Sequence, residues 1–74
     1  MLSFLLHVEA RFYRVELTEN LFGEYSVTRE WGRRGSRGRQ VLVWFANLRE
    51  AVIAADLWRR QAMRRGYRAE RIAA

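Results

Sequence analysis

The sequence predicts a small α+β domain, in which an antiparallel sheet of three to four strands is covered on one face by a single α-helix. Three observations lead to this fold class. Apolar residues alternate with a period of two in the first half of the chain, the period lengthens after Phe45, and turn residues separate the segments. With 74 residues the chain can build one small core, so we expect residues 1–74 to form a single domain.

The first predicted strand begins at Tyr13. Tyr13, Val15 and Leu17 are apolar and the residues between them are polar, which is the period of a half-buried strand. Residues 18–23 follow and contain asparagine and glycine, both of which favour a turn.

Two further runs predict strands at 24–31 and 41–45. In the first run, Tyr25 and Val27 alternate with polar residues, but Arg29 then takes a position expected to be apolar. Either a β-bulge shifts the register at Arg29, or the strand has left the core there and Arg29 faces solvent. The second run is apolar on both faces, which is typical of a central strand covered on one side by a helix and partly covered on the other.

The longer period after Phe45 predicts a helix from about residue 48 to 65. Asn47 followed by Glu50 is typical of a capping box at its start. Gly66 supplies a left-handed stop at its end. Residues 67–72 then either add a short last strand or pack as a tail.

The apolar positions of these elements predict the core. Ile53 and Leu57 lie off the main apolar stripe of the helix, so the helix either crosses the sheet obliquely or offers a small apolar patch to a partner. Trp44 and Trp58 are expected to be packing residues. The predicted core consists chiefly of Tyr13, Val15, Tyr25, Val27, Val43, Phe45, Leu48, Val52, Ala55 and Trp58.

Composition excludes several classes of function. There is no cysteine, and His7 is the only imidazole, so we expect neither a metal site nor a cofactor. No carboxylate pair and no Ser–His or Cys–His arrangement supports catalysis, so an enzyme is not expected. The apolar run 2–8 has no basic region before it and is shorter than the roughly 20 residues of a membrane span. We interpret it as mature structure and expect a cytoplasmic protein without a membrane partner.

The charge favours an anionic partner. All fourteen basic residues are arginine, and the net charge is +6. A GC-rich genome, which encodes cationic residues as arginine, explains the absence of lysine as well as a binding function does. It does not explain the excess of positive charge. In a small domain such an excess most often indicates nucleic acid, although solubility alone also accounts for net charge.

The segment Trp31-Gly32-Arg33-Arg34-Gly35 ends the second predicted strand with a ring, two glycines and two guanidinium groups. Residues 32–39 form a predicted loop with four arginines and three glycines. Such a loop suits a nucleic-acid end, because arginines attract phosphates, a ring stacks on an exposed base or sugar, and glycine lets the backbone approach a phosphate. The alternatives are a core role for Trp31, a solvated loop for the arginines and simple turn geometry for the glycines.

These residues resemble the WGR domain, and the resemblance extends from about residue 11 to 67. It includes the tyrosine strand, the second glycine after the motif arginine, and the strand and alanine-rich helix that follow. Small bacterial proteins of this kind consist of the domain almost alone. The segments that carry the resemblance are Phe12-Tyr13-Arg14-Val15-Glu16-Leu17, Leu21-Phe22-Gly23, Tyr25-Ser26-Val27-Thr28-Arg29-Glu30-Trp31-Gly32-Arg33-Arg34-Gly35 and Arg64-Arg65-Gly66-Tyr67.

The resemblance implies a role at DNA breaks. In the DNA-damage-sensing poly(ADP-ribose) polymerases, WGR domains help to dock the enzyme on breaks. There the motif tryptophan stacks at the duplex end, and the motif arginine contacts DNA or a neighbouring domain. Trp31 and Arg33 correspond to these residues. The catalytic domains of those enzymes have no counterpart in this chain, so ADP-ribosylation is not implied.

Two departures from the polymerases concern phosphate recognition. Those relatives tend to carry an asparagine just before the first strand, where this chain has Ala10, and a Lys-Thr-x-Asn-x-Trp pattern after the helix, which is absent here. Recognition of a specific 5′-phosphate is therefore open. Arg11 and the additional arginines are expected to keep a non-specific phosphate affinity.

Two functions follow from the sequence. The first is a module that binds DNA, with a preference for double-stranded ends or nicks and with RNA as an alternative nucleic acid. The second is a protein-interaction module that binds an acidic partner through Trp31 and Arg33 or through the apolar helix patch. The oligomeric state is left open. The predicted nucleic-acid-binding residues are Trp31, Gly32, Arg33, Arg34, Arg37, Arg39, Arg11, Arg64, Arg65 and Tyr67.

Overall fold

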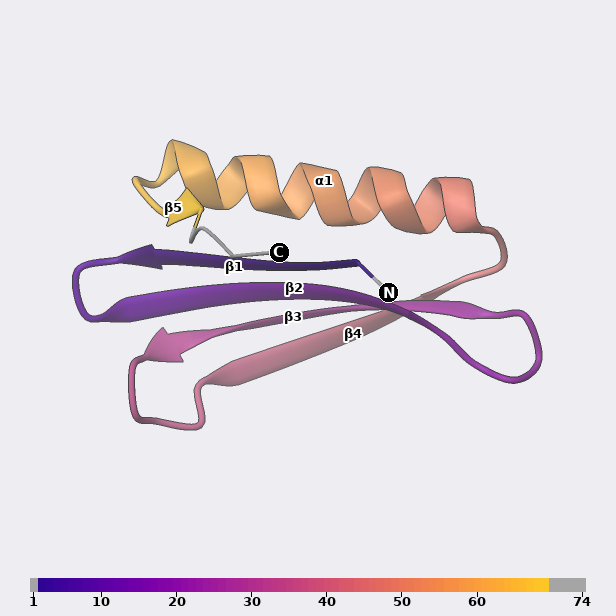
Figure 1. Cartoon of the computed structure of the whole chain (residues 1–74), viewed down its shortest axis with the longest axis horizontal. Helices are drawn as coiled ribbons and strands as arrows, with labels where there is room; N and C mark the ends of the chain where they lie inside the picture. Colours follow the sequence, from indigo (N-terminus) through magenta and orange to yellow (C-terminus); the bar gives the residue numbers. More distant parts are fainter. Residues whose placement is uncertain (1, 70–74) are drawn as a thin grey trace.

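The computed structural model describes residues 2–69. The elements are β1 (Leu2–Val8), β2 (Arg11–Glu19), β3 (Tyr25–Arg33), β4 (Arg39–Phe45), α1 (Leu48–Arg64) and β5 (Arg68–Ala69). The strands form one antiparallel sheet in the order β4-β3-β2-β1-β5, and α1 lies across one of its faces (Figure 1). The predicted α+β class is therefore confirmed, with five strands where three to four were expected.

The additional strand comes from the apolar N-terminal run. β1 pairs with β2 through a two-residue turn between Val8 and Arg11, in which Glu9 has a positive φ of 50°. Its other edge pairs with β5, where His7 opposes Arg68. Residues 70–72, the rest of the segment predicted as a strand or a tail, lie outside the described residues. β1 is thus an interior strand, and Leu6 at its centre is fully buried.

The odd positions of β2 and β3 face the helix and form the core. Val15, Leu17 and Val27 are buried, as is Tyr13. The pairs Leu17–Val27 and Val15–Arg29 continue one register without a bulge, so Arg29 lies on the same face as Val27. Both sequence interpretations of Arg29 are therefore wrong. β3 keeps its period of two as far as Trp31, so there is no bulge at Arg29, and the Arg29 side chain lies on the helix side of the sheet rather than facing solvent.

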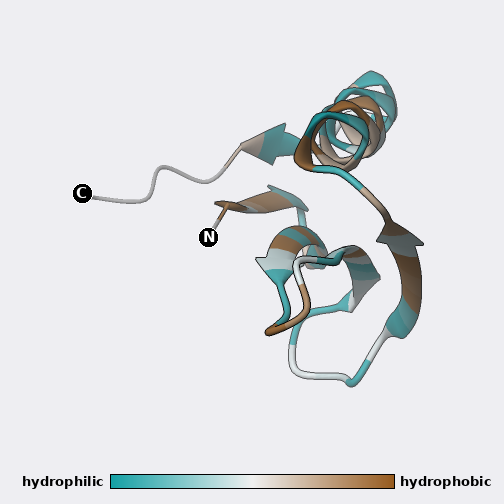
Figure 2. Ribbon diagram, turned by 90° about the vertical axis from the view of Figure 1, so that its right-hand side faces the viewer, coloured by the Kyte–Doolittle hydropathy of each residue, from teal (hydrophilic) through white to brown (hydrophobic). Residues whose placement is uncertain are grey.

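β4 is an edge strand rather than the predicted central strand. It pairs only with β3 and forms the apolar outer edge of the sheet at the right of Figure 2. Leu42 and Trp44 lie on the face opposite the helix, where no second layer of described residues covers them, and are 48% and 55% exposed. The packing role expected of Trp44 is therefore wrong. Val43 and Phe45 lie on the helix side and are half-buried.

The ends of α1 match the predicted signals. The backbone N–H of Glu50 donates to Asn47 Oδ1 over 2.9 Å, which satisfies one of the free amides of the first turn. At the other end Arg65 is the C-cap, and Gly66 has a φ of 97°. The predicted helix start and stop are confirmed.

The buried face of α1 is made of alanine. Ala51, Ala55 and Ala62 are buried, and their small side chains let the helix lie close to the sheet. Leu48 and Val52, two predicted core residues, are 47% and 40% exposed. They are displaced to the border because the alanine stripe occupies the centre of the contact. Of the remaining predicted core residues, Ala55 is buried. Tyr25, Phe45 and Trp58 are half-buried and pack against the cluster of buried residues.

The turn between β2 and β3 lies at the opposite end of the sheet from the loop between β3 and β4 (Figure 1). Asn20 Oδ1 accepts the backbone N–H of Phe22 over 2.8 Å and that of Glu24 over 3.0 Å. The Asn20 amide donates to Glu24 Oε1 over 3.0 Å. This network presents Leu21 and Phe22 to solvent, with 99% and 87% of their surfaces exposed.

No helix within residues 2–69 combines the length and the apolar character that crossing a membrane would demand.

Candidate nucleic-acid interface

Four segments meet at one end of the molecule, on the left of Figure 1: the β1–β2 turn, the β3–β4 loop, the end of α1 and β5. Residues 8–11, 31–39 and 62–69 contain eight arginines and one carboxylate, that of Glu9. The net charge of the whole chain is +6. The excess positive charge is therefore concentrated at this end, which we call the basic end.

A cavity of about 350 Å³ opens at the basic end, and we call it the Trp31 cavity. β2 contributes its first residue, β3 its last three, and the helix end and the residue before β5 close the opposite side. Six of the ten predicted binding residues are brought together here, although they come from three separate segments of the chain. The lining residues are Val8, Arg11, Trp31, Gly32, Arg33, Arg65 and Tyr67.

Trp31 is at once a packing residue and a wall of this cavity. Its ring is half-buried and stacks on Tyr13, with ring centroids 6.2 Å apart and planes at 20°. Tyr67 meets Tyr13 edge-on at 5.7 Å and 65°. These contacts lock the indole in place before any ligand arrives, so binding on its exposed part costs little side-chain entropy.

Arg29 places a fixed cation behind Trp31. Its guanidinium carbon lies 5.5 Å from the Trp31 ring centroid and 4.7 Å from that of Trp58, within the range of cation–π attraction. Arg29 Nε is buried and makes no hydrogen bond within the described part of the chain. A second hollow of about 200 Å³ is lined by Tyr13, Arg29, Trp31 and Arg65.

Sequence reasoning missed Arg29, Tyr13 and Val8 as site residues. The signal for Arg29 was its odd position, in phase with Val27 and Trp31. Tyr13 was assigned to the core alone. Val8 belongs to a run for which no strand was predicted.

The β3–β4 loop is tied to the neighbouring turn. Ser36 donates from its backbone N–H, over 3.1 Å, and from its hydroxyl, over 2.7 Å, to the carbonyl oxygen of Arg33. The backbone N–H of Arg34 donates to the carbonyl oxygen of Ala10 over 2.7 Å. Ala10 therefore contributes its backbone acceptor to the loop, and its methyl side chain adds no hydrogen-bonding group.

The other four predicted residues lie elsewhere. Arg34 and Arg37 line a larger cavity on the opposite face of the sheet. Arg39 pairs with Trp31 across the sheet and is exposed, and Arg64 is exposed in the last turn of α1. Neither Arg39 nor Arg64 lines the Trp31 cavity. Arg33 and the loop arginines Arg34 and Arg37 line different cavities because β3 ends at Arg33 and the loop after it turns to the face opposite the helix.

Two arginines of the helix are bound within the helix itself. Arg59 Nη2 lies 2.6 Å from Asp56 Oδ1, and Arg60 Nε lies 2.8 Å from Asp56 Oδ2. The hydrogen bond from Arg59, followed by the nearby charges of Arg60 and Arg59, lowers the pKa of the Asp56 carboxyl. Asp56 therefore offsets part of the charge of this turn, and the helix contributes to the basic end chiefly through its last residues.

Within residues 2–69 the structure has no group of three or more His, Cys, Asp or Glu side chains placed to hold a metal ion.

Comparison with known proteins gives two matches. The sequence matches the family model of the WGR domain over residues 4–73. It is also similar to the uncharacterized protein y4dW of Sinorhizobium fredii (strain NBRC 101917 / NGR234), with 40% identity over 60 residues. That alignment covers 80% of this chain and 29% of the relative, so the chain spans less than a third of that protein's length. No solved structure matches the chain.

The family match covers nearly all of the described residues, including every residue that lines the Trp31 cavity. The chain belongs to the WGR domain family.

Proposed function

We propose that the chain is a nucleic-acid-binding module, without catalytic activity, that docks on DNA ends or nicks through its basic end. The observation that carries the proposal is the Trp31 cavity, in which a fixed indole is surrounded by Arg11, Arg33 and Arg65. Family membership supports it, because WGR domains are generally nucleic-acid-binding modules.

Arginine and tryptophan have different tasks in this proposal. The guanidinium groups of Arg11, Arg33 and Arg65 neutralise phosphates and release counterions, which favours any nucleic acid. The indole of Trp31 needs an exposed base or sugar face. In an intact duplex these faces are already stacked, and the half-buried ring cannot move to insert between them. At an end or a nick the face is accessible, so Trp31 favours ends.

The structure around Ala10 argues against recognition of the 5′-phosphate by a side-chain amide at this position. The methyl side chain of Ala10 has no donor, and its carbonyl oxygen already accepts from Arg34. Phosphate contacts therefore rest on the arginines, whose attraction depends on charge rather than on one terminal group. We expect duplexes with and without a 5′-phosphate to bind with similar affinity.

A titration against four forms of DNA tests the proposal. The protein is titrated by fluorescence anisotropy with blunt, nicked and overhanging duplex and with intact circular duplex, at several salt concentrations. We expect the open forms to bind more tightly than the circle. Trp31→Ala should remove that preference, at a cost of about 1 to 3 kcal/mol, the range of one base–aromatic stack.

Two controls make the result specific. Trp31 packs against the core, so each variant is first checked for cooperative thermal unfolding. Arg33→Ala is compared with Arg49→Ala, which removes an exposed arginine from the first turn of α1, outside the basic end. Equal affinity for all four DNA forms would contradict end recognition. A parallel titration with duplex RNA shows whether the module distinguishes the two nucleic acids.

A protein-interaction module is the second candidate, and one observation favours it. Ile53 and Leu57 on α1 are 57% and 49% exposed, which makes the predicted apolar helix patch available. Ile53→Glu should leave DNA affinity unchanged under the first proposal. Absence of DNA binding at moderate salt, together with an intact fold, would favour the second candidate.

A further inference from the structure

The face of the sheet opposite the helix contains a cavity of about 660 Å³, larger than the Trp31 cavity. We call it the Phe12 cavity. Its volume lies within the roughly 300 to 1,000 Å³ typical of small-ligand sites. The lining residues are Leu5, Phe12, Arg14, Glu30, Arg34, Gly35, Ser36, Arg37, Gly38 and Gln40.

The floor of the Phe12 cavity is apolar. Phe12 and Leu5 are half-buried on neighbouring strands, and no described element packs over this face of the sheet. The loop approaches the ring closely, because a Cβ built on Gly38 would lie 3.1 Å from Phe12 Cζ. The Phe12 ring therefore lies in a hollow that opens to solvent and is bordered on one side by the loop.

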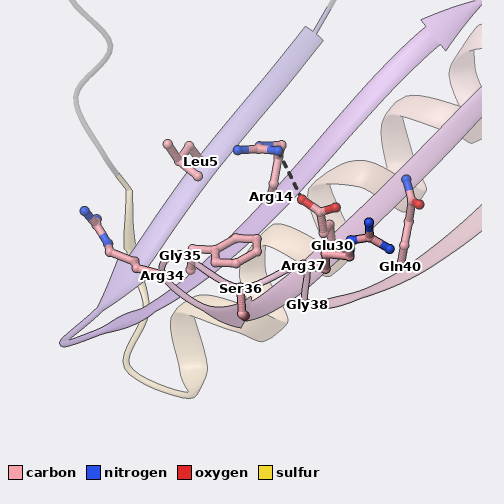
Figure 3. A pocket seen from close by; sticks show the side chains of 10 residues that line it. Leu5, Arg14, Glu30, Arg34, Gly35, Ser36, Arg37, Gly38 and Gln40 are labelled. Atoms are coloured by element: carbon pink, nitrogen blue, oxygen red, sulfur yellow. Dashed lines mark hydrogen bonds and ion pairs between the residues drawn. The ribbon is translucent and has the colours of Figure 1, made fainter.

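A guanidinium group is held beside this ring. The Arg14 guanidinium carbon lies 5.8 Å from the Phe12 ring centroid. Arg14 Nη1 donates to Glu30 Oε1 over 3.1 Å, the contact dashed in Figure 3. Aromatic rings and guanidinium planes are the two side-chain surfaces on which unpaired bases stack.

The loop adds positive charge to the apolar floor. Arg34 and Arg37 line the cavity from the loop side and extend in different directions from it (Figure 3). Glu30 is the one carboxylate among the lining residues and is engaged by Arg14. Gly35 has open space where a Cβ would lie, so the loop backbone is accessible to an anion at that position. A ligand with one flat apolar part and one anionic part fits this combination, and a nucleotide is such a ligand.

The same loop separates the two cavities. Gly32 and Arg33 line the Trp31 cavity, whereas residues 34–38 line the Phe12 cavity. We propose that the Phe12 cavity receives an unpaired nucleotide from a DNA end docked at Trp31, so that the module prefers overhanging or frayed ends. This inference rests on the proposed function. A fully paired terminal base cannot occupy the Phe12 cavity, because its partner strand keeps it in the stack.

The test compares a blunt duplex with the same duplex carrying a three-nucleotide overhang. We expect the overhang to tighten binding by about five- to 150-fold, the range for one stacked base. Phe12→Leu, which keeps apolar volume but removes the ring, should abolish this increment and leave blunt-end affinity unchanged. Arg37→Gln should reduce the increment. Trp44→Leu is the matched control, because Trp44 is an exposed ring on the same face outside the cavity.

A single-stranded probe separates this inference from the proposed function. The 5′-phosphorylated thymidine trinucleotide is titrated against wild type and Phe12→Leu, each checked for cooperative unfolding. If circular and blunt DNA bind alike but the trinucleotide binds in a Phe12-dependent way, end docking fails and the nucleotide site stands. If blunt ends are preferred but the overhang adds nothing, the nucleotide site is overturned. A Phe12→Leu variant that weakens blunt and overhanging duplex equally overturns it as well.

Discussion

Arg29 shows how a charged residue is kept on the core side of a small sheet. Cation–π attraction to Trp31 and Trp58 contributes about 0.5 to 2 kcal/mol, depending on desolvation. Its buried Nε, which makes no hydrogen bond among the described residues, costs about 1 to 3 kcal/mol. The two effects nearly cancel, so stability alone does not account for an arginine at this position. Its place beside Trp31 and Arg65 suggests a role in the interface.

Replacing Arg29 with methionine should therefore separate stability from binding. We expect Arg29→Met to change the free energy of unfolding by less than about 1 kcal/mol, because the lost attraction and the removed desolvation cost offset each other. DNA affinity should fall, because one cation beside Trp31 is lost. Urea unfolding and anisotropy measure the two effects. A loss of stability above about 3 kcal/mol would show that Arg29 is primarily structural.

At the scale of the element, the β3–β4 hairpin depends on two glycines that nearly touch. A Cβ built on Gly32 would lie 2.6 Å from Gly38 Cα, and one built on Gly38 would overlap the carbonyl oxygen of Trp31. Gly38 also has a φ of 68°. Because this hairpin walls both cavities, its close crossing determines where the arginines on each side of the loop lie.

Gly38→Ala should therefore cost more stability than Gly35→Ala. Gly35 has a φ of 85° but open space around its Cβ position, so its substitution carries only the left-handed backbone penalty of about 1 to 2 kcal/mol. Gly38→Ala adds overlap with backbone, which we expect to bring a further 1 to 3 kcal/mol or so. Urea unfolding of both variants measures the difference. Equal costs would show that the hairpin can open without penalty.

Elements with a strong local signal were predictable. β2, β3 and α1 have clear periods, and the Asn47 and Gly66 caps mark the helix ends. The position of β4 was not predictable, because Val41, Leu42 and Val43 look alike in sequence whether or not a second layer covers the sheet. β1 pairs locally with β2, but it was missed because Phe4, Leu5 and Leu6 are apolar in succession and show no period of two.

The candidate site was predictable as a set of residue types and not as a geometry. The motif and the arginine pattern pointed to Trp31 and Arg33, and the structure places both in one cavity with Arg11 and Arg65. The loop arginines were expected to act together with them. Arg37 instead lies on the opposite face of the sheet. The backbone conformation of the turn decides on which face the loop lies, and the amino-acid composition of the loop does not reveal it.

The whole molecule is electrically polarised along its 38 Å long axis. The β2–β3 turn is flanked by Glu19 and Glu24, whereas the arginines of the loop and the helix end lie at the other end (Figure 1). A polarised charge orients the molecule as it approaches a polyanion and speeds association at low salt. Binding should accordingly present the basic end first.

Salt dependence measures how many phosphates this end neutralises. With four to six phosphates, roughly, the logarithm of the affinity should fall against the logarithm of salt concentration with a slope of about −3.5 to −5.5. Arg33→Ala should reduce the magnitude of the slope by about 0.9, because one phosphate contact is lost. Arg49→Ala, outside the basic end, should leave the slope unchanged. A slope near zero would exclude an electrostatic interface.

The β2–β3 turn provides a site at which a label or a surface tether can be attached. The chain contains no cysteine, so Phe22→Cys would create a single thiol on a side chain that is 87% exposed and is held up by the Asn20 network. A fluorophore or a surface tether attached there would sit at the pole opposite the arginines. Molecules immobilised in this way would all direct the Trp31 cavity into solution, with the basic end unobstructed.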